Sequence, residues 1–197
     1  MTDNEDYVSV TLLDIKGTWR GIADSARTTI GKEPSTSEVK SDWKKRMLLC
    51  EHSPIRKLII SWKWYGLKYW ISTHFVRHKF GIEHWVRTQR TDRTGKNRDN
   101  INQDALVEHE AEANAQTIIN ISRKRLCIQS SSGTIDAWLA FLFSIREKEP
   151  ELFNACVPDC VYRGWCYEYK SCGFHLTPEF QVQINEYRQG INNWRDI

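Results

Sequence analysis

A basic segment at residues 77–93, RHKFGIEHWVRTQRTDR, carries the side chains with the clearest capacity for binding chemistry. Arginines, a lysine and histidines alternate there with apolar residues such as Phe80, Ile82 and Trp85. Arginine can bind phosphate through two parallel N–H donors, and lysine supplies a point charge. The segment therefore suits a nucleic-acid backbone or a small phosphate-bearing ligand, and a solvated charged surface is the simplest alternative.

Two further segments carry polar groups at suggestive positions. In residues 114–127, Asn114 and Arg125 are eleven positions apart, or about three helical turns, so a helix would place them on one face. Asn120 would lie about a third of a turn away, and amides can read flavin or pyrimidine edges because they offer donors and an acceptor. In residues 51–56, EHSPIR, a turn carries His52 and Ser53, which could face a ligand or only cap a helix.

Cysteines gather near the C-terminal end, at Cys156, Cys160, Cys166 and Cys172, with His175 just beyond. Clustered thiolates could hold zinc or an iron–sulfur centre, and Cys127 could join them. The gaps are longer than the compact pairs of zinc modules, so packed free thiols are the alternative.

The composition is that of a folded protein of one domain. The chain has 197 residues, 40% hydrophobic and 27% charged, and a net charge of +3. That near balance disfavours a nucleic-acid-binding module. The acidic start MTDNEDYVSV does not resemble a signal peptide, and no apolar run approaches the roughly 20 residues of a membrane helix. We expect a cytoplasmic protein with reduced cysteines and no membrane partner.

The elements that must position these side chains follow from periodicity and capping signals. Glu108, Glu110 and Glu112 come early in one long helical pattern and Arg123, Lys124 and Arg125 come late, as the helix dipole prefers. Ser35 and Glu38 have the spacing of a capping box. The expected elements are a strand at 7–15, a helix or turn at 21–30, a helix after Pro34, a strand at 55–66, a helix at 67–78, a loop at 91–103, helices at 103–127 and 134–149, and an irregular cysteine-bearing region after Pro150.

Taken in order, these segments resemble the flavin-dependent thymidylate synthases, also called thymidylate synthase complementing proteins. The family's Arg-His-Arg run, with Ser and Arg about ten residues later, is similar to Arg77-His78-Lys79 followed by Thr88-Gln89-Arg90. Its His-x-Ser/Thr-Pro-Phe-Glu-His turn resembles EHSPIRK, and its Ala-Arg-x-Ser resembles Ala26-Arg27-Thr28-Thr29. Its Asn-x5-Asn-x4-Arg helix is matched by Asn114, Asn120 and Arg125. The resemblance extends from about residue 8 to about residue 148.

This resemblance implies a fold and an activity. The fold would be α+β, an antiparallel sheet packed with long helices, and the chain would form a homotetramer with active sites between subunits. FAD would be reduced by NADPH and would carry a one-carbon unit from methylenetetrahydrofolate to dUMP, giving dTMP. Residues 1–150 would form the flavin-dependent thymidylate synthase-like domain, and residues 151–197 a cysteine-containing extension packed on it.

The resemblance also implies roles for individual residues. The flavin would contact Arg77, His78, Lys79, Asn114 and Asn120, with Thr29, His52 and Ser53 close to it. The substrate side would hold Arg90 on the nucleotide phosphate, Arg98 as a further phosphate contact, Arg125 on the pyrimidine ring, Thr88 beside the uracil and His74 in place of a usual glutamine. Thr88 and Arg125 would be the catalytic side chains.

Several positions depart from the family pattern. Lys79 replaces an arginine and loses the bidentate fork. The span from Lys79 to Arg90 is one residue longer, which puts Trp85 or Val86 where a glutamate is expected. Glu51 replaces a histidine, and residues 55–57 are Ile-Arg-Lys in place of Phe-Glu-His. The sequence therefore indicates a divergent member. Another pyrimidine nucleotide, a hydroxymethyl product, or a non-catalytic nucleotide-binding homologue stay open as alternatives.

Overall fold

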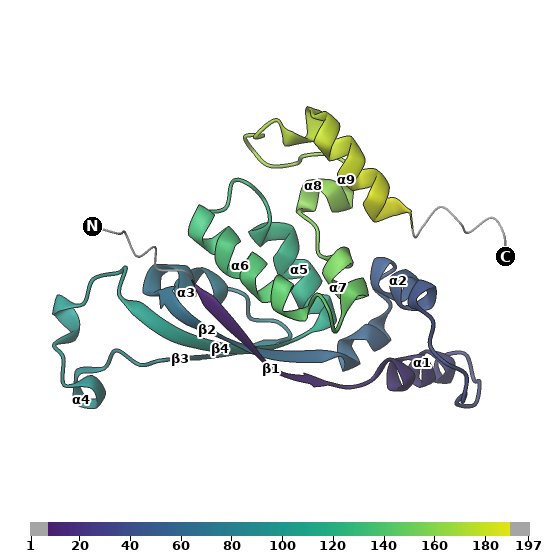
Figure 1. The fold of residues 1–197 in the computed structure, drawn as a ribbon, viewed down its shortest axis with the longest axis horizontal. Coiled ribbons are helices and arrows are strands. Elements are labelled where there is room, and N and C mark those ends of the chain that lie inside the picture. Colours follow the sequence, from purple (N-terminus) through teal and green to yellow (C-terminus); the bar gives the residue numbers. More distant parts are fainter. Residues whose placement is uncertain (1–7, 190–197) are drawn as a thin grey trace.

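An antiparallel sheet of four strands forms the framework of the protein (Figure 1). It is seen in a computed structural model that describes residues 8–189. The strands follow the spatial order β1-β2-β4-β3, with bounds β1 (Ser9–Lys16), β2 (Ile59–Lys68), β3 (Ile82–Val86) and β4 (Leu106–Asn114). The expected α+β architecture, an antiparallel sheet packed with helices, is confirmed.

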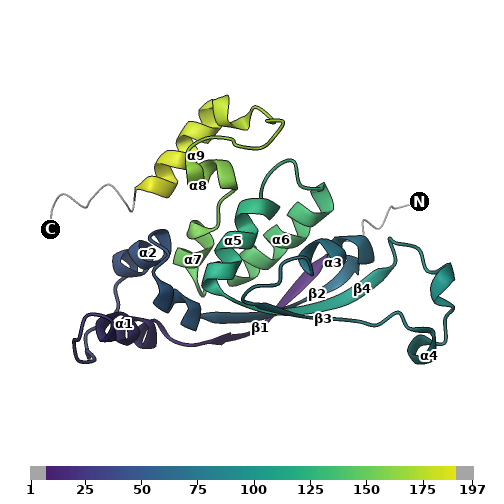
Figure 2. The ribbon, with the colours of Figure 1, turned by 180° about the vertical axis from the view of Figure 1, so that it is seen from behind.

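Helices α3, α5, α6 and α7 lie over one face of the sheet in both views (Figures 1 and 2). Helices α1 and α4 lie near opposite ends of the sheet, and α8 and α9 stack above the others. The helices are α1 (Trp19–Thr28), α2 (Ser41–Leu49), α3 (Tyr69–Phe75), α4 (Thr91–Thr94), α5 (Ala115–Arg125), α6 (Ser132–Ile145), α7 (Pro150–Ala155), α8 (Asp159–Arg163) and α9 (Pro178–Arg188). Short 3-10 turns are η1 (Ser53–Lys57), η2 (Arg98–Asn100) and η3 (Phe174–Leu176).

Buried tryptophans pack and hydrogen-bond the covering helices against the sheet. Along β2, Trp62 and Trp64 point to the covered face, as its alternating pattern predicts, and both are fully buried. Trp62 stacks on Phe141 of α6 at 3.9 Å between ring centroids. The Trp64 indole donates to the Ala137 carbonyl at 2.8 Å, and the Trp138 indole donates to Ser122 Oγ of α5 at 2.9 Å. These tryptophans form the core, so they are not platforms for a ligand.

The expected long helix at 103–127 is wrong in its first half. Residues 106–114 form β4, in which Val107, His109, Ala111 and Ala113 are buried and the glutamates between them are not. This period of two is typical of a strand with one covered face. The glutamates pair across strands, Glu108 with Lys63 of β2 and Glu112 with Lys16 of β1, both at 2.5 Å. They serve the sheet and not a helix dipole.

Other expectations are corrected on a smaller scale. Helix α2 begins at Ser41 with Lys40 at its N-cap and without a side-chain cap, so the capping box at Ser35 and Glu38 is wrong. The 91–103 region contains α4 and η2, so it is not wholly a loop. The region after residue 150 holds α7, α8 and α9, so it is not irregular. The expected strands at 7–15 and 55–66 and the helix at 134–149 are confirmed within a few residues.

Two hydrophobic clusters divide the C-terminal part. Leu152, Ala155 and Cys156 of α7 and its end belong to the main core. Val157, Val161, Phe180 and Ile184 form a second, smaller cluster between α8 and α9. The division expected at residue 150 stays a prediction. Within residues 8–189, no helix is long and apolar enough to cross a membrane.

We predict that Ser122→Ala lowers the free energy of unfolding by about 1–3 kcal/mol, because the buried Trp138 N–H loses its acceptor. Urea denaturation followed by tryptophan fluorescence measures this loss. Ser144→Ala is the matched control, since Ser144 Oγ donates only to the Phe141 carbonyl of its own helix and is partly exposed. An equal loss in the two variants would contradict this role of Ser122.

Candidate functional site

One end of the sheet collects most of the predicted cofactor residues. Strands β1 and β4 end there and β2 and β3 begin there, because Lys16 pairs with Ile59, Ile59 with Asn114, and Ile82 with Ala113. Antiparallel topology therefore brings four chain segments to one edge. These segments are α1 with Thr29 at its C-cap, η1 with His52 and Ser53, residues 77–81, and the start of α5 at Asn114. We call this edge the α5 end of the sheet.

Hydrogen bonds of Asn114 and Thr117 fix the residues before β3 against the start of α5. Its N–H donates to the Gly81 carbonyl at 3.1 Å, and its Oδ1 caps α5 by accepting from the Thr117 N–H at 3.0 Å. Thr117 Oγ1 in turn donates to the Phe80 carbonyl at 2.9 Å. Gly81 has a φ of +74°, and a Cβ there would overlap Thr117 and Asn114, so only glycine fits. Segment 77–81 is thereby fixed against α5.

Arg125, the last residue of α5, binds the segment 77–81 at His78. Its Nε donates to His78 Nε2 at 3.0 Å, and one terminal nitrogen donates to the His74 carbonyl at 2.6 Å. Arginine has no acceptor, so His78 Nε2 must be unprotonated and its ring neutral. Burial, followed by the charge of Arg125, lowers the pKa of His78 to about 4. The pKa of Arg125 is itself lowered by burial and by the nearby Arg77.

Three cations near this end, Arg77, Lys79 and Arg125, have no acidic partner among the described residues. Among the described residues, no carboxylate forms an ion pair with Arg77, Lys79 or Arg125. Arg77 and Lys79 are exposed and Arg125 is half-buried. His74 lies beside them, with Nδ1 3.0 Å from Thr134 Oγ1, and its pKa is lowered by burial, Arg125 and Arg77. The arrangement suits an anionic ligand, which would neutralise a positive cluster that no described carboxylate pairs with.

Other predicted cofactor residues are placed less directly. Asn120 faces away from Arg125, and its Oδ1 accepts from Arg123 at 3.1 Å and from Gln116 at 3.4 Å. Arg123 and Gln116 both also bind Glu51. Thr29 donates to the Ala26 carbonyl at 2.7 Å. His52 and Ser53 are exposed at the start of η1, which contacts both α1 and α5. These residues share the α5 end but do not converge on Arg125.

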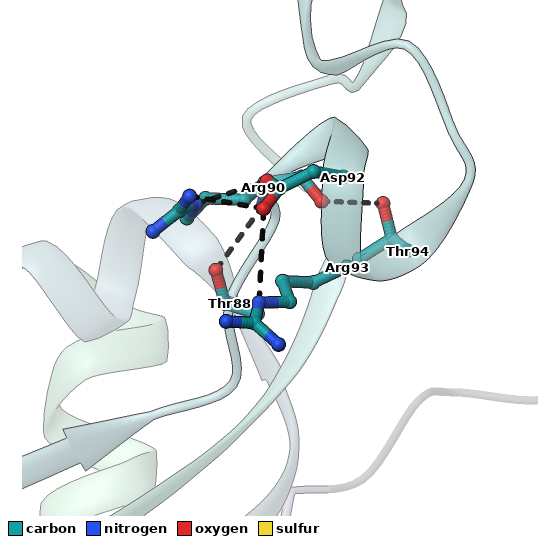
Figure 3. Close-up of polar contacts among 5 residues, drawn as sticks. All are labelled: Thr88, Arg90, Asp92, Arg93 and Thr94. Carbon is teal, nitrogen blue, oxygen red and sulfur yellow. Dashed lines mark hydrogen bonds and ion pairs between the residues drawn. The ribbon is translucent and has the colours of Figure 1, made fainter.

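Three residues predicted on the substrate side, two for phosphate and one beside the uracil, lie at the opposite end of the sheet. Thr88, Arg90 and Arg98 follow β3 on the connection to β4. Arg90 binds Asp92 through two parallel bonds, from Nε at 3.0 Å and from a terminal nitrogen at 2.9 Å (Figure 3). Thr88 Oγ1 accepts from the Arg90 N–H at 3.2 Å. Among the described residues, no hydrogen bond or ion pair joins Arg90 to Arg125, whose partners are His78 and the His74 carbonyl.

A pair of histidines on the covered face of the sheet was not predicted from the sequence. His84 of β3 lies 2.9 Å from His109 of β4, Nδ1 to Nε2. Burial lowers the pKa of both rings, that of His109 to about 3 with a smaller contribution from His84. The alternation of β3 and β4 could have placed both rings on the covered face. Because a helix is expected at residues 103–127, the sequence pattern does not predict the pairing of His84 with His109.

The cysteines do not form the metal site that the sequence left open as one of two alternatives. Within residues 8–189, no group of three or more Cys, His, Asp or Glu side chains is arranged to hold a metal ion. Cys127, Cys156, Cys160, Cys166 and Cys172 instead line an open pocket of about 1310 Å³ between the core helices and the α8–α9 unit. Burial raises the pKa of Cys127 and Cys160, and that of Cys156 to about 12, so these thiols stay protonated at neutral pH.

Solved structures share this arrangement of strands and helices. Thymidylate synthase X from Helicobacter pylori, with FAD and dUMP, matches with a TM-score of 0.61 at 14% identity, covering 77% of this chain and 99% of its own. The chain has the flavin-dependent thymidylate synthase fold. A second Helicobacter pylori structure of that enzyme, complexed with FAD and dUMP, matches with a TM-score of 0.61 at 12% identity, over 76% of this chain and 99% of its own.

The same fold occurs in a UMP/dUMP methylase, PolB from Streptomyces cacaoi, bound with 5-Br dUMP. It matches with a TM-score of 0.61 at 10% identity and covers 75% of this chain and 94% of its own. No family model and no curated protein matches the sequence. The flavin-dependent thymidylate synthase fold expected from the motifs is therefore confirmed by structure, while the residue roles stay predictions.

We predict that the protein loses stability as the pH falls from 7 to 5. His74, His78, His84 and His109 all have folded pKa values below 6.5, so the unfolded chain binds more protons in this window. Their contribution is complete above about pH 6.5 and is lost as the pH falls toward the folded values. Urea unfolding at each pH measures the slope.

His109→Gln isolates the histidine contribution, because the raised pKa of Glu149 acts in the opposite direction in both proteins. The variant should show a smaller pH slope than the wild type. An unchanged slope would contradict a neutral, buried His109.

We also predict that Asp92→Asn strengthens phosphate binding by Arg90 about threefold to tenfold, since the carboxylate occupies the guanidinium fork that a phosphate would use. Calorimetric titration with dUMP measures the affinity. Asp104→Asn, at another exposed acid of the same connection, is the matched control. Equal affinities for the two variants would mean that Arg90 does not bind the phosphate.

Proposed function

We propose that this chain is an FAD-dependent enzyme that transfers a one-carbon unit to a pyrimidine nucleotide. dUMP is the first candidate acceptor, with dTMP as product, methylenetetrahydrofolate as carbon donor and NADPH as reductant. The observation that carries the proposal is the cationic cluster of Arg77, Lys79 and Arg125 around a neutral His78, in a fold whose solved examples hold FAD and dUMP.

The residues of the α5 end fit a flavin dinucleotide. Its diphosphate is anionic, and Arg77 and Lys79 are exposed cations without a carboxylate partner among residues 8–189. Asn114 has its Oδ1 committed to capping α5, so a flavin contact would use its Nδ2 donor. Asn120 is engaged by Arg123 and Gln116, which makes it the weakest of the predicted contacts. When bound, FAD would supply the redox chemistry and the carrier for the one-carbon unit.

Arg125 is suited to orient the pyrimidine. Its Nε and one terminal nitrogen are fixed by His78 and His74, which holds the guanidinium plane still. The remaining N–H donors could bind a uracil carbonyl and polarise the ring, the kind of charge stabilisation that preorganised donors provide. The chain would thus contribute orientation and hydrogen bonding and no covalent nucleophile.

The nucleotide phosphate would be held by Arg90, with Thr88 and Arg98 nearby. Arg90 lies beyond the end of β3, while Arg125 binds His78, which contacts His84 in the middle of that strand. We infer that one nucleotide would take these two arginines from different copies of the chain. This placement supports active sites shared between copies, as in the homotetramer that the resemblance implies. The connection that carries α4 projects away from the helices, where another copy could receive it (Figures 1 and 2).

The test is product formation. Protein supplied with FAD, NADPH, dUMP and deuterium-labelled methylenetetrahydrofolate should yield labelled dTMP, detected by mass spectrometry. Arg125→Lys should lower the rate about a hundredfold or more, because it removes the donor to His78 and the fixed fork. Arg188→Lys, at the exposed end of α9, is the matched control and should retain the rate.

Other outcomes would decide between the alternatives. A labelled hydroxymethyl product, or product only with another pyrimidine nucleotide, would assign the divergent substrate-side residues to a changed reaction. FAD and nucleotide binding without any product would identify a non-catalytic homologue and contradict the enzymatic proposal.

A further inference from the structure

A chain of hydrogen bonds runs across the sheet and ends on the backbone of His78. Ser72 Oγ of α3 lies 3.0 Å from His109 Nδ1, and His109 Nε2 lies 2.9 Å from His84 Nδ1. His84 Nε2 lies 3.1 Å from the His78 carbonyl oxygen. Four residues from α3, β4, β3 and the segment before β3 are thereby joined in a line.

The last bond sets the direction of all the others. A carbonyl oxygen only accepts, so His84 Nε2 must carry a proton. In a neutral ring Nδ1 is then an acceptor, and His109 must donate to it from Nε2. His109 Nδ1 is consequently an acceptor, and the Ser72 hydroxyl must donate to it. Each hydrogen bond of this chain is therefore donated in the direction from Ser72 to the His78 carbonyl.

The surroundings of His109 and His84 keep both imidazole rings neutral. His109 is fully buried, with Trp64 of β2 at 5.2 Å and Phe75 of α3 at 6.3 Å between ring centroids. His84 is partly buried beside the His109 ring. The acid next to His84 in sequence, Glu83, is exposed on the other face of β3. A charged imidazole in the line would be desolvated without a paired carboxylate, which is costly.

His78 is held at three points by three different elements. Its N–H donates to the Phe75 carbonyl at the end of α3 at 2.9 Å, its carbonyl accepts from His84 of β3, and its Nε2 accepts from Arg125 of α5. With Nε2 occupied as an acceptor, the single ring proton of neutral His78 must sit on Nδ1. The ring can then offer a ligand only a donor.

We propose that His84 is a positioning residue for the ligand-binding segment Arg77–Lys79. The hydrogen bonds donated from Ser72 to His109 and from His109 to His84 orient the His84 ring. His84 then donates to the His78 carbonyl, which keeps the His78 ring against Arg125. His78 Nδ1–H then serves as a donor to an acceptor atom of the ligand, a phosphate or carbonyl oxygen. This inference deepens the flavin and nucleotide function proposed above and rests on it for the identity of the ligand.

Histidine suits position 84 because one ring nitrogen accepts from His109 while the other donates to a carbonyl. Leucine could do neither. Glutamine could retain the donor that reaches the His78 carbonyl, since its amide nitrogen lies about as far along the side chain as Nε2. These two substitutions therefore separate the donor to His78 from the presence of a side chain at this place.

The tautomers can be read without any ligand. Long-range ¹H–¹⁵N NMR correlation of the ¹⁵N-labelled full chain at pH 7 should show His84 and His109 protonated at Nε2 and His78 protonated at Nδ1. A protonated Nδ1 on His84 or on His109, or a protonated Nε2 on His78, would overturn the proposal. This result does not depend on whether any variant folds.

The variants test the consequence for the site. FAD affinity, measured by quenching of flavin fluorescence, should weaken about tenfold in His84→Leu and by no more than about threefold in His84→Gln. His84→Leu should also lose the single Nδ1–H tautomer of His78. His175→Gln is the matched control, because that histidine is buried and bonds Ser171 near the second hydrophobic cluster. It should leave the His78 signals and FAD affinity unchanged.

Failure of the two proposals can be told apart. If the wild type does not bind FAD, the proposed function fails, while the His78 tautomer in His84→Leu still reports positioning. If the wild type binds FAD and His84→Leu changes neither the affinity nor the His78 signals, the positioning role of His84 is overturned.

Discussion

The hydrogen bond from Arg125 Nε to His78 Nε2 is the contact on which the rest of the candidate site depends. It joins the end of α5 to the segment that leads into β3, two parts of the chain that share no other side-chain pair of this kind among the described bonds. Because arginine can only donate, the bond also fixes the protonation of His78.

Packing keeps α5 where the bond needs it. The Trp138 indole of α6 is bonded to Ser122 on α5, while Trp62 stacks on Phe141 of the same α6. The sheet, α6 and α5 are thereby linked through large, fully buried rings with few alternative packings. At the other side, Asn114 and Thr117 hold Phe80 and Gly81 against the start of α5. The flexible cations Arg77 and Lys79 are thus carried on a rigid base.

The sequence allowed the motif residues to be found but not their mutual geometry. Arg77-His78-Lys79 and Arg125 were selected by type and spacing, and the structure brings them together. Asn120 was placed with them by helical arithmetic, yet it faces Glu51 and Arg123, since a third of a turn suffices to reach another neighbour. The glutamates of 106–114 were taken for a helix start because their cross-strand partners, Lys16 and Lys63, are distant in sequence.

The hydrogen-bonded histidines illustrate the same limit of prediction from sequence. His84 and His109 are 25 positions apart, and only the pairing of β3 with β4 makes them neighbours. The cysteines show the converse, since proximity in sequence and a shared pocket did not produce a metal site among the described residues. Local patterns indicated the elements, and long-range pairing decided which polar groups meet.

The visible absorption spectrum of FAD titrated with the protein, before and after addition of dUMP, tests most directly whether the α5 end is a flavin and nucleotide site. A saturable change in the flavin bands, followed by a second change on adding dUMP, is the predicted result, and Arg77→Ala combined with Arg125→Ala should abolish both. A spectrum identical to free FAD at all protein concentrations, with or without dUMP, would contradict it.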